Sequence, residues 1–241
     1  MIYPDILAAL TRERSGTFLA EAEAARRARQ ARRHRQPGRA SGTRITPRLA
    51  AAGTPVVLRD GSAVLIRQVR STDAPLLADG FARLSPRSRR TRFLGAKTTL
   101  SAAELRYFTE VDHHDHEAIG ALSAADGRGV GIARYIRDAD DPQAAEIAVT
   151  VVDDWQGRGL GTELLSRLSD RARHVGIHRL TALVAAENAA VAGLARKLGA
   201  CLAGRGPGTV EYEIALAPAE YSLDWWFGCV DGLAQPVREG R

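Results

Sequence analysis

Three alternate glycines between an apolar strand and an amphipathic helix constrain this chain more than any other feature. Residues 151–162 read VVDDWQGRGLGT. Glycines let a backbone turn tightly and approach a ligand closely, and a helix N-terminus presents N–H donors with a partial positive charge. The segment therefore predicts a phosphate-binding loop. The alternative is a tight strand–helix connection whose glycines serve only packing.

The glycine spacing excludes two common nucleotide-binding motifs. No Gly-Lys-Ser/Thr follows, so this is not a Walker loop. Gly157, Gly159 and Gly161 also lack the G-x-G-x-x-G spacing of a dinucleotide fingerprint. A phosphate-binding loop of another kind remains.

The flanking sequence predicts a mixed α/β domain. Hydrophobic periodicity and turn residues indicate strands at 56–58, 63–69, 118–123, 130–137, 145–152, 179–185 and 210–216. They indicate helices at 71–84, 86–93, 101–111, 160–175 and 189–198. Ser71-Thr72-Asp73 is expected to cap the first of these helices, and a Ser101/Glu104 capping box to open the third. The strand–helix–strand unit 145–185 predicts a parallel strand pair, and hence a partly parallel twisted sheet flanked by helices.

The charge is concentrated near the N-terminus. The whole chain carries +6, but residues 1–48 hold eleven arginines against four acids, so the rest is close to neutral. We expect a basic helical extension over 1–36, a linker over 37–54, the compact domain over 55–216 and a C-terminal extension over 217–241. The arginines of 26–35 form either a solvated helical tail or a weak contact with a polyanion or acidic surface. Aromatic residues are absent there, which argues against base stacking.

Composition narrows the class of protein. The chain has 241 residues, 45% hydrophobic and 26% charged, which is typical of a globular protein. No apolar stretch approaches the ~18 residues of a membrane-spanning helix, and the apolar run 6–10 is too short for a signal peptide. Two cysteines, Cys201 and Cys229, are too few for a disulfide framework or a zinc site, and we expect both to be buried thiols. We expect a cytoplasmic protein; oligomeric state stays open.

A run of histidines invites a metal hypothesis. His113, His114, Asp115 and His116 are consecutive, but adjacent side chains rarely converge on one ion and no distant partner is evident. We therefore predict no metal. A role of His113 or His116 on the substrate side remains an alternative.

Gln156–Gly161 resembles the Q/R-x-x-G-x-G/A loop of the GNAT superfamily of N-acetyltransferases, and Asn188–Gly199 is similar to that family's Asn-led helix ending in Leu-Gly. Within the superfamily, the chain resembles the bacterial Pat-type protein lysine acetyltransferases. Segments that carry this likeness are Leu58–Gly61, Ile66–Arg67, Leu84–Ser88, Arg92–Phe93, Val111–His113, Gly131–Tyr135 and Ala145–Ala148. The resemblance covers about 55–216. The N-terminal segment is too short for an additional regulatory domain, so nucleotide regulation is not implied.

The resemblance implies acetyl-CoA as co-substrate. It assigns the pyrophosphate to Gln156, Gly157, Arg158, Gly159, Gly161 and Thr162. It lays the pantetheine arm along Ala148, Val149, Thr150 and Val151, and gives Asn188 a side-chain contact to the arm. Lys197 is placed to reach a CoA phosphate, although a solvated lysine at a helix end is an equal alternative.

Direct transfer to an amine requires a proton acceptor. A lysine with a pKa near ~10.4 is neutral in only ~1 molecule in 1000 near pH 7.4, which costs ~4 kcal/mol. Glu146 is the candidate general base, ten residues before Gln156 in an Ala-Glu-Ile pattern similar to the Pat type; a solvent-facing glutamate is the alternative. Backbone N–H groups of Val149 and Val151 are expected to polarise the carbonyl. Many relatives have a tyrosine as general acid where this chain has Ala195, so no acid is assigned.

Three functions remain open. The first is acetyl transfer to a protein lysine, and the second is acetyl transfer to a small amine that enters past the Arg-rich segment 83–92. The third is a non-catalytic acyl-CoA-binding or scaffold protein, which the missing tyrosine favours and Glu146 disfavours. Turnover of acetyl-CoA with a mixture of amines would distinguish the two enzyme hypotheses from the non-catalytic one.

Overall fold

A computed structural model describes residues 53–216, and all structural statements below concern that range. The strands are β1 (Thr54–Val57), β2 (Ala63–Gln68), β3 (His116–Ser123), β4 (Gly129–Arg137), β5 (Ala144–Val151), β6 (Arg179–Ala185), β7 (Cys201–Gly206) and β8 (Thr209–Ala215). The helices are α3 (Ala74–Ala82), α4 (Pro86–Phe93), α5 (Ala102–Thr109), α6 (Leu160–His174) and α7 (Ala189–Lys197). The predicted extensions over 1–36 and 217–241, and most of the linker 37–54, lie outside the described residues.

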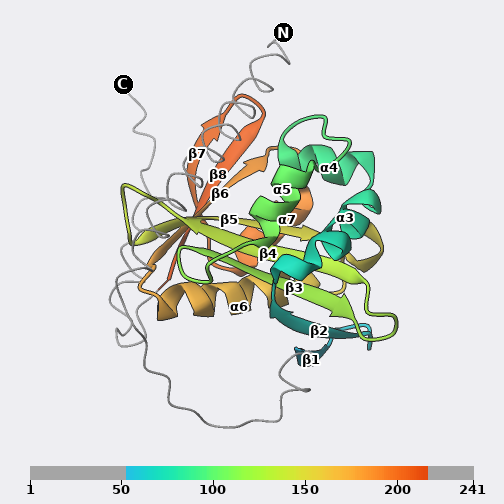
Figure 1. Cartoon of the computed structure of the whole chain (residues 1–241). Helices are drawn as coiled ribbons and strands as arrows, with labels where there is room; N and C mark the ends of the chain where they lie inside the picture. Colours follow the sequence, from blue (N-terminus) through green and yellow to red (C-terminus); the bar gives the residue numbers. More distant parts are fainter. Residues whose placement is uncertain (1–52, 217–241) are drawn as a thin grey trace, which may run out of the picture.

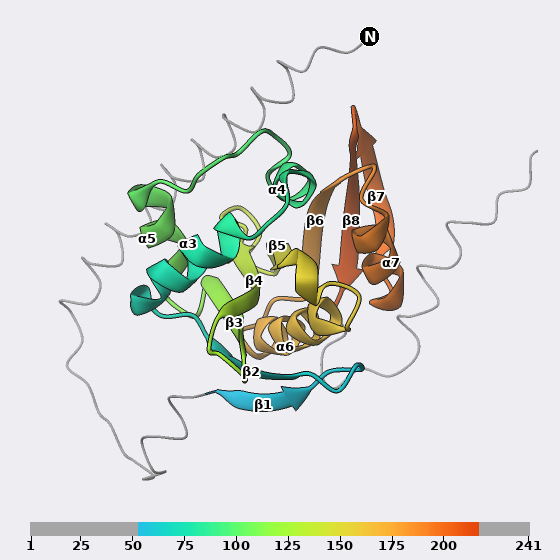
Figure 2. The same ribbon diagram turned by 90° about the vertical axis from the view of Figure 1, so that its right-hand side faces the viewer.

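The eight strands form one sheet in the order β1-β2-β3-β4-β5-β6-β8-β7. Only β5 and β6 run parallel, and α6 connects them, as the strand–helix–strand pattern predicts. Figures 1 and 2 show α6 along one face of the sheet and α3, α4 and α5 on the opposite face. The predicted mixed, partly parallel, helix-flanked sheet is confirmed.

The main core lies between the sheet and α6. Leu160, Leu164 and Leu168 recur at helical spacing and are almost completely buried. They pack with sheet residues such as Ala133 and Tyr135, also fully buried. The apolar face that the sequence shows on α6 therefore fixes this helix against the centre of the sheet.

Local signals set most helix starts. Ser101 and Glu104 form the predicted capping box of α5, with each side chain bonded to the other residue's backbone N–H. Ser85 caps α4 by accepting from the N–H of Ser88. At α3 the prediction needs correction, because Asp73 makes no side-chain cap to that helix. Its carboxylate instead binds the Arg67 guanidinium at 2.6 and 2.8 Å.

Strand β7 is absent from the predicted elements. Its sequence CLAGRG holds two glycines, its residues are mostly exposed, and it forms the outer edge of the sheet beside β8. An edge strand with one partner and no buried face lacks the alternating apolar pattern by which strands are recognised. Cys201 lies in β7 and is exposed, contrary to the expectation of a buried thiol, while Cys229 lies outside the described residues.

Strands β5 and β6 pair over only three residues. Their parallel ladder joins Ala144 to Arg179, Ala145 to Leu180 and Glu146 to Thr181, and no pairing follows it. Figure 2 shows the two strands side by side in the middle of the molecule, with α4 near the upper end of β6. The edge of β5 beyond Glu146 is therefore open to a ligand.

No helix in the range 53–216 is long and apolar enough to cross a membrane.

Candidate active site

A groove of about 690 Å³ opens where β5 and β6 separate. Its walls come from α4, β5, the glycine loop, β6, α7 and β8. Most of the residues expected from the sequence to bind acetyl-CoA line it: Ala148, Val149, Thr150, Val151, Gln156, Gly157, Gly159, Gly161, Thr162, Asn188 and Lys197. Glu146 lines the same groove. One continuous surface thus joins the glycine loop to the candidate base.

The glycine loop has the backbone that its sequence suggests. Gly157 and Gly159 adopt φ values of 76° and 95°, in the left-handed region that favours glycine. Gly159 is the N-cap of α6, and no side chain caps this helix. The first-turn N–H groups of α6 thus lack a side-chain acceptor and face a groove that an anion can enter.

Gly161 plays a different part from the other two glycines. Its φ is not positive, and a Cβ there would lie 3.5 Å from a Leu194 methyl and 3.8 Å from a Val151 methyl. These are ordinary contact distances. Gly161 therefore lets α6 pack close to α7 and β5. This is the packing role expected from the sequence as the alternative to phosphate binding.

Backbone direction alternates along β5. The N–H of Val152 donates to the carbonyl of Val130, and the carbonyl of Ala144 accepts from Asp138, so even-numbered residues face β4. The β4–β5 register between these points shows no bulge. Val149 and Val151 therefore direct their N–H and C=O groups into the gap beside β6. This refines the expectation for the pantetheine arm, because the backbone groups of Ala148 and Thr150 are directed at β4.

The even-numbered side chains of β5 share one face of the sheet. Glu146, Ala148 and Thr150 alternate with Ile147 and Val149, which pack toward the main core. The face that carries Glu146 is the one that α4 covers, because Arg92 of α4 donates from Nε to Thr150 Oγ1 at 3.1 Å. Glu146 thus lies on the face of the sheet that α4 covers, at the point where the β5–β6 ladder ends.

Arg92 brings a guanidinium into the groove within electrostatic range of Glu146. Burial lowers the pKa of Arg92, and the negative charge of Glu146 opposes that shift. Arg92 lines the same groove as Glu146. The face of β5 that carries Glu146 therefore also holds a cation, which is bonded to Thr150.

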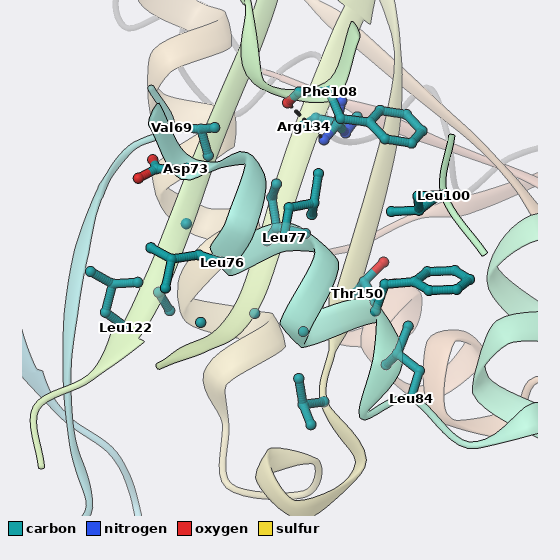
Figure 3. Close-up of a pocket in the computed structure, with 18 of the residues that line it drawn as sticks. Val69, Asp73, Leu76, Leu77, Leu84, Leu100, Phe108, Leu122, Arg134 and Thr150 are labelled. Carbon is teal, nitrogen blue, oxygen red and sulfur yellow. Dashed lines mark hydrogen bonds between the residues drawn. The ribbon is translucent and has the colours of Figure 1, made fainter. Parts of the chain in front are cut away.

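A second guanidinium lies close by in a smaller, apolar cavity of about 100 Å³ beneath α3 (Figure 3). Arg134 of β4 is 5% exposed, stacks 4.3 Å from the centre of the Phe108 ring, and donates to the Phe108 carbonyl. Burial, together with repulsion from Arg92, lowers the pKa of Arg134 to about 9. Arg92 and Thr150 line both cavities, so they form part of the wall between them.

The histidine run divides between two faces of the sheet. His116 Nε2 lies 3.3 Å from Arg134 Nη1, on the side of Glu146. His113 Nδ1 instead lies 2.7 Å from Glu117 Oε1, and Glu117 is fully buried and bonded to Arg171 of α6. No group of three or more metal-ligating side chains occurs within the described range.

Some predicted cofactor residues have side chains engaged elsewhere. Gln156 donates from its amide to the Val151 carbonyl at 3.0 Å. Asn188 caps α7 by accepting from the N–H of Val191. Arg158, which does not line the groove, is ion-paired with Asp60 at 2.9 Å. Lys197 is exposed at the end of α7, where either a phosphate contact or solvation fits.

Comparison with known proteins identifies the family. The model of the acetyltransferase (GNAT) domain matches residues 63–200, more than half of the chain. The chain belongs to the GNAT family of acetyltransferases. This GNAT chain is 33% identical over 175 residues to the acetyltransferase Pat of Mycolicibacterium smegmatis. The aligned residues make up 72% of the chain. The chain spans 52% of the length of that relative.

Two further relatives support the same assignment. The GNAT chain is 39% identical over 144 residues to the acetyltransferase PA5475 of Pseudomonas aeruginosa, covering 59% of the chain and 77% of the relative. The crystal structure of the GNAT domain of S. lividans PAT superposes with a TM-score of 0.65 at 30% identity, covering 69% of the chain and 98% of that domain. The predicted family and its Pat-type resemblance are confirmed, and acetyl-CoA is the co-substrate that the GNAT groove fits.

The sequence motifs missed several groove residues. Arg59 precedes the glycine loop by about a hundred positions, and Tyr212 enters from β8. Asp153, between β5 and the glycine loop, accepts hydrogen bonds from Ser85 and Ser88 and so fixes the start of α4. Arg59 and Asp153 lie within segments singled out in the sequence, but neither segment gave them a role in the groove. Arg59 and Tyr212 reach the groove only through long-range folding. Ala195 is buried in α7 and offers no hydroxyl, so the general acid stays unassigned.

Proposed function

We propose that this chain transfers the acetyl group of acetyl-CoA directly to the side-chain amine of a protein lysine. The observation that supports this most is the shared groove. Glu146 and the glycine loop stand at opposite ends of the unpaired segment of β5, and both line one cavity. A thioester held along that segment would have its phosphates at the loop and its acyl group near Glu146.

Each step has a group to serve it. The N–H groups around Gly157, Gly159 and Thr162 hold the pyrophosphate. The N–H groups of Val149 and Val151, directed into the gap, polarise the thioester carbonyl.

Glu146 accepts the proton of the attacking amine, directly or through water. The new N–C bond forms as the C–S bond breaks. The thiolate leaves with its electron pair, and the proton passes to Glu146 and then to solvent.

A protein lysine is favoured by the Pat-type relatives and by the exposure of the groove rim. Arg87 of α4 lines the groove and is exposed, as are Ala189 and Ala190 of α7. A long lysine side chain presented by another protein can therefore reach Glu146 from the surface. Residues 26–35, expected to form either a solvated tail or a weak contact with a polyanion or acidic surface, lie outside the described residues.

A small amine with an acidic group is the second candidate. Arg87 and Arg92 of α4 both line the groove, and Arg92 lies within electrostatic range of Glu146. An acceptor carboxylate would find complementary charge there.

The test is acetyl transfer followed by release of the CoA thiol. Purified chain with acetyl-CoA is offered a lysine peptide mixture and, separately, a panel of amino acids and polyamines. Turnover of the peptides supports the proposal. Turnover of small amines alone supports the second candidate instead. Binding of acetyl-CoA without turnover of any amine would indicate an acyl-CoA-binding protein.

Acetyl-lysine mapping then identifies the acceptor. A lysate incubated with the wild-type chain is compared with one incubated with Glu146→Gln. Sites present only with the wild type are substrates. Equal site occupancy in both lysates would contradict an enzymatic origin.

A further inference from the structure

We infer that Arg59 is the cation that binds the pyrophosphate of acetyl-CoA, in place of the motif residue Arg158. The inference rests on the acetyl-CoA part of the proposed function and is independent of the acceptor. Arg59 belongs to the turn between β1 and β2, far in sequence from the glycine loop.

The β1–β2 turn packs directly against the glycine loop. The backbone N–H of Arg59 donates to the Arg158 carbonyl at 3.3 Å. The Arg59 side chain lies over Gly159: a Cβ built there would meet its Nε at 3.4 Å and its Cδ and Cγ at 3.6 Å. Arg59 thus lies over the N-cap of α6, at the helix end that no side chain caps.

The Arg158 side chain is held away from the groove by three contacts. Its guanidinium pairs with Asp60 at 2.9 Å, donates to the Asp154 carbonyl at 2.6 Å, and stacks 4.9 Å from the centre of the Trp155 ring. Arg158 is absent from the groove lining, whereas Arg59 is part of it. The adjacent residues Arg59 and Asp60 therefore have different roles: Asp60 binds the Arg158 guanidinium, and the Arg59 side chain lies over the glycine loop.

Charge supports the same assignment. No carboxylate of residues 53–216 forms a salt bridge with Arg59, and its side chain is exposed. A guanidinium with available donors, next to uncapped helix N–H groups, suits two neighbouring phosphates. The pyrophosphate would thus lie between the N-terminus of α6 and Arg59.

The experiment compares Arg59→Gln, Arg59→Lys and the matched control Arg158→Gln by calorimetry on the full chain. Acetyl-CoA affinity should fall about tenfold in Arg59→Gln, the range for a hydrogen bond to a charged group. It should fall less in Arg59→Lys and stay near wild type in Arg158→Gln. The loss should be the same with 3′-dephospho-acetyl-CoA, which retains the pyrophosphate.

Three results would overturn the inference. They are unchanged affinity in Arg59→Gln, a larger loss in Arg158→Gln, or a loss that disappears with the dephospho ligand and so points to the 3′-phosphate. Melting of the ligand-free variants controls for structure, and a lowered melting temperature in Arg59→Gln would make Arg59 a structural residue instead. If the wild type fails to bind acetyl-CoA, the proposed function fails, and that outcome is distinct from all of these.

Discussion

Glu146 is the last residue of β5 that pairs with β6, and its partner across the parallel ladder is Thr181. Beyond this pair the two strands separate and the groove begins. The candidate base thus lies on paired, rigid backbone, while the next residues keep an open edge for the thioester. A base fixed at the end of a ladder needs little reorganisation when an amine arrives.

Replacing Asp153 by alanine should loosen α4. The Asp153 carboxylate accepts from the Ser85 N–H at 2.9 Å, from Ser85 Oγ at 2.7 Å and from Ser88 Oγ at 2.8 Å. Its loss should cost about 1–3 kcal/mol of unfolding free energy and raise the KM of the acceptor, since α4 carries Arg92. Denaturant unfolding and steady-state kinetics measure both effects. Asp154→Ala is the control, and equal effects in the two variants would contradict this role of Asp153.

Replacing Arg171 by methionine should destabilise the fold strongly. Arg171 of α6 binds the Oε2 atom of Glu117 at 2.8–2.9 Å, and Glu117 is 0% exposed. The variant would remove the guanidinium from a buried carboxylate that keeps its contacts with Gln68 and His113, which should cost about 3–5 kcal/mol. Arg173→Met, two residues along the same helix, removes an exposed pair with Asp170 and should cost under about 1 kcal/mol. Similar melting temperatures for the two variants would rule out the buried pair as a stabilising contact.

Stability should fall in acid as Asp73 is protonated. Burial raises the pKa of Asp73, but hydrogen bonds from Arg67 and the Arg70 backbone outweigh burial and hold the pKa below its ordinary value of 3.8. A depressed folded-state pKa gives stability that is present above the unfolded-state pKa and lost as pH falls through the folded-state value. We therefore expect the difference in unfolding free energy between the wild type and Asp73→Asn, measured by urea titration, to become smaller below about pH 4. A difference independent of pH would exclude this linkage.

The elements that follow from the sequence are those with local signals. Alpha helix α4 and strand β6 have the predicted bounds, because Ser85 and Pro86 mark the helix start and the parallel pair requires a strand after α6. The glycine loop could be predicted because positions with positive φ favour glycine, which is visible in the sequence. The expected cap of α3 was wrong because Asp73 binds Arg67 of β2 instead of the first turn of that helix.

In the candidate site, too, residues close together in the sequence could be predicted, and residues brought in by long-range folding could not. Glu146, Val149, Gly157 and Gly159 lie in one continuous segment and could be assigned together. Arg59 and Arg92 reach the groove from the first hairpin and from α4, and their spacing to that segment carries no pattern. The sequence places the Arg-rich segment 83–92 only at the entry of a small amine, and it gives Arg92 no individual role. The structure shows that Arg92 turns inward, where Thr150 Oγ1 accepts its Nε–H.

Turnover by Glu146→Gln tests the central claim most directly. It is measured with a lysine peptide that the wild type acetylates, under conditions where chemistry is rate-limiting, beside acetyl-CoA affinity by calorimetry. The amide keeps the shape of the side chain but accepts no proton, so kcat should fall by about 10²–10⁴ while acetyl-CoA affinity stays unchanged. Glu187→Gln, on the exposed partner of Arg90, should retain wild-type kcat. A kcat for Glu146→Gln close to wild type would contradict the account, because the amine would then lose its proton to another group.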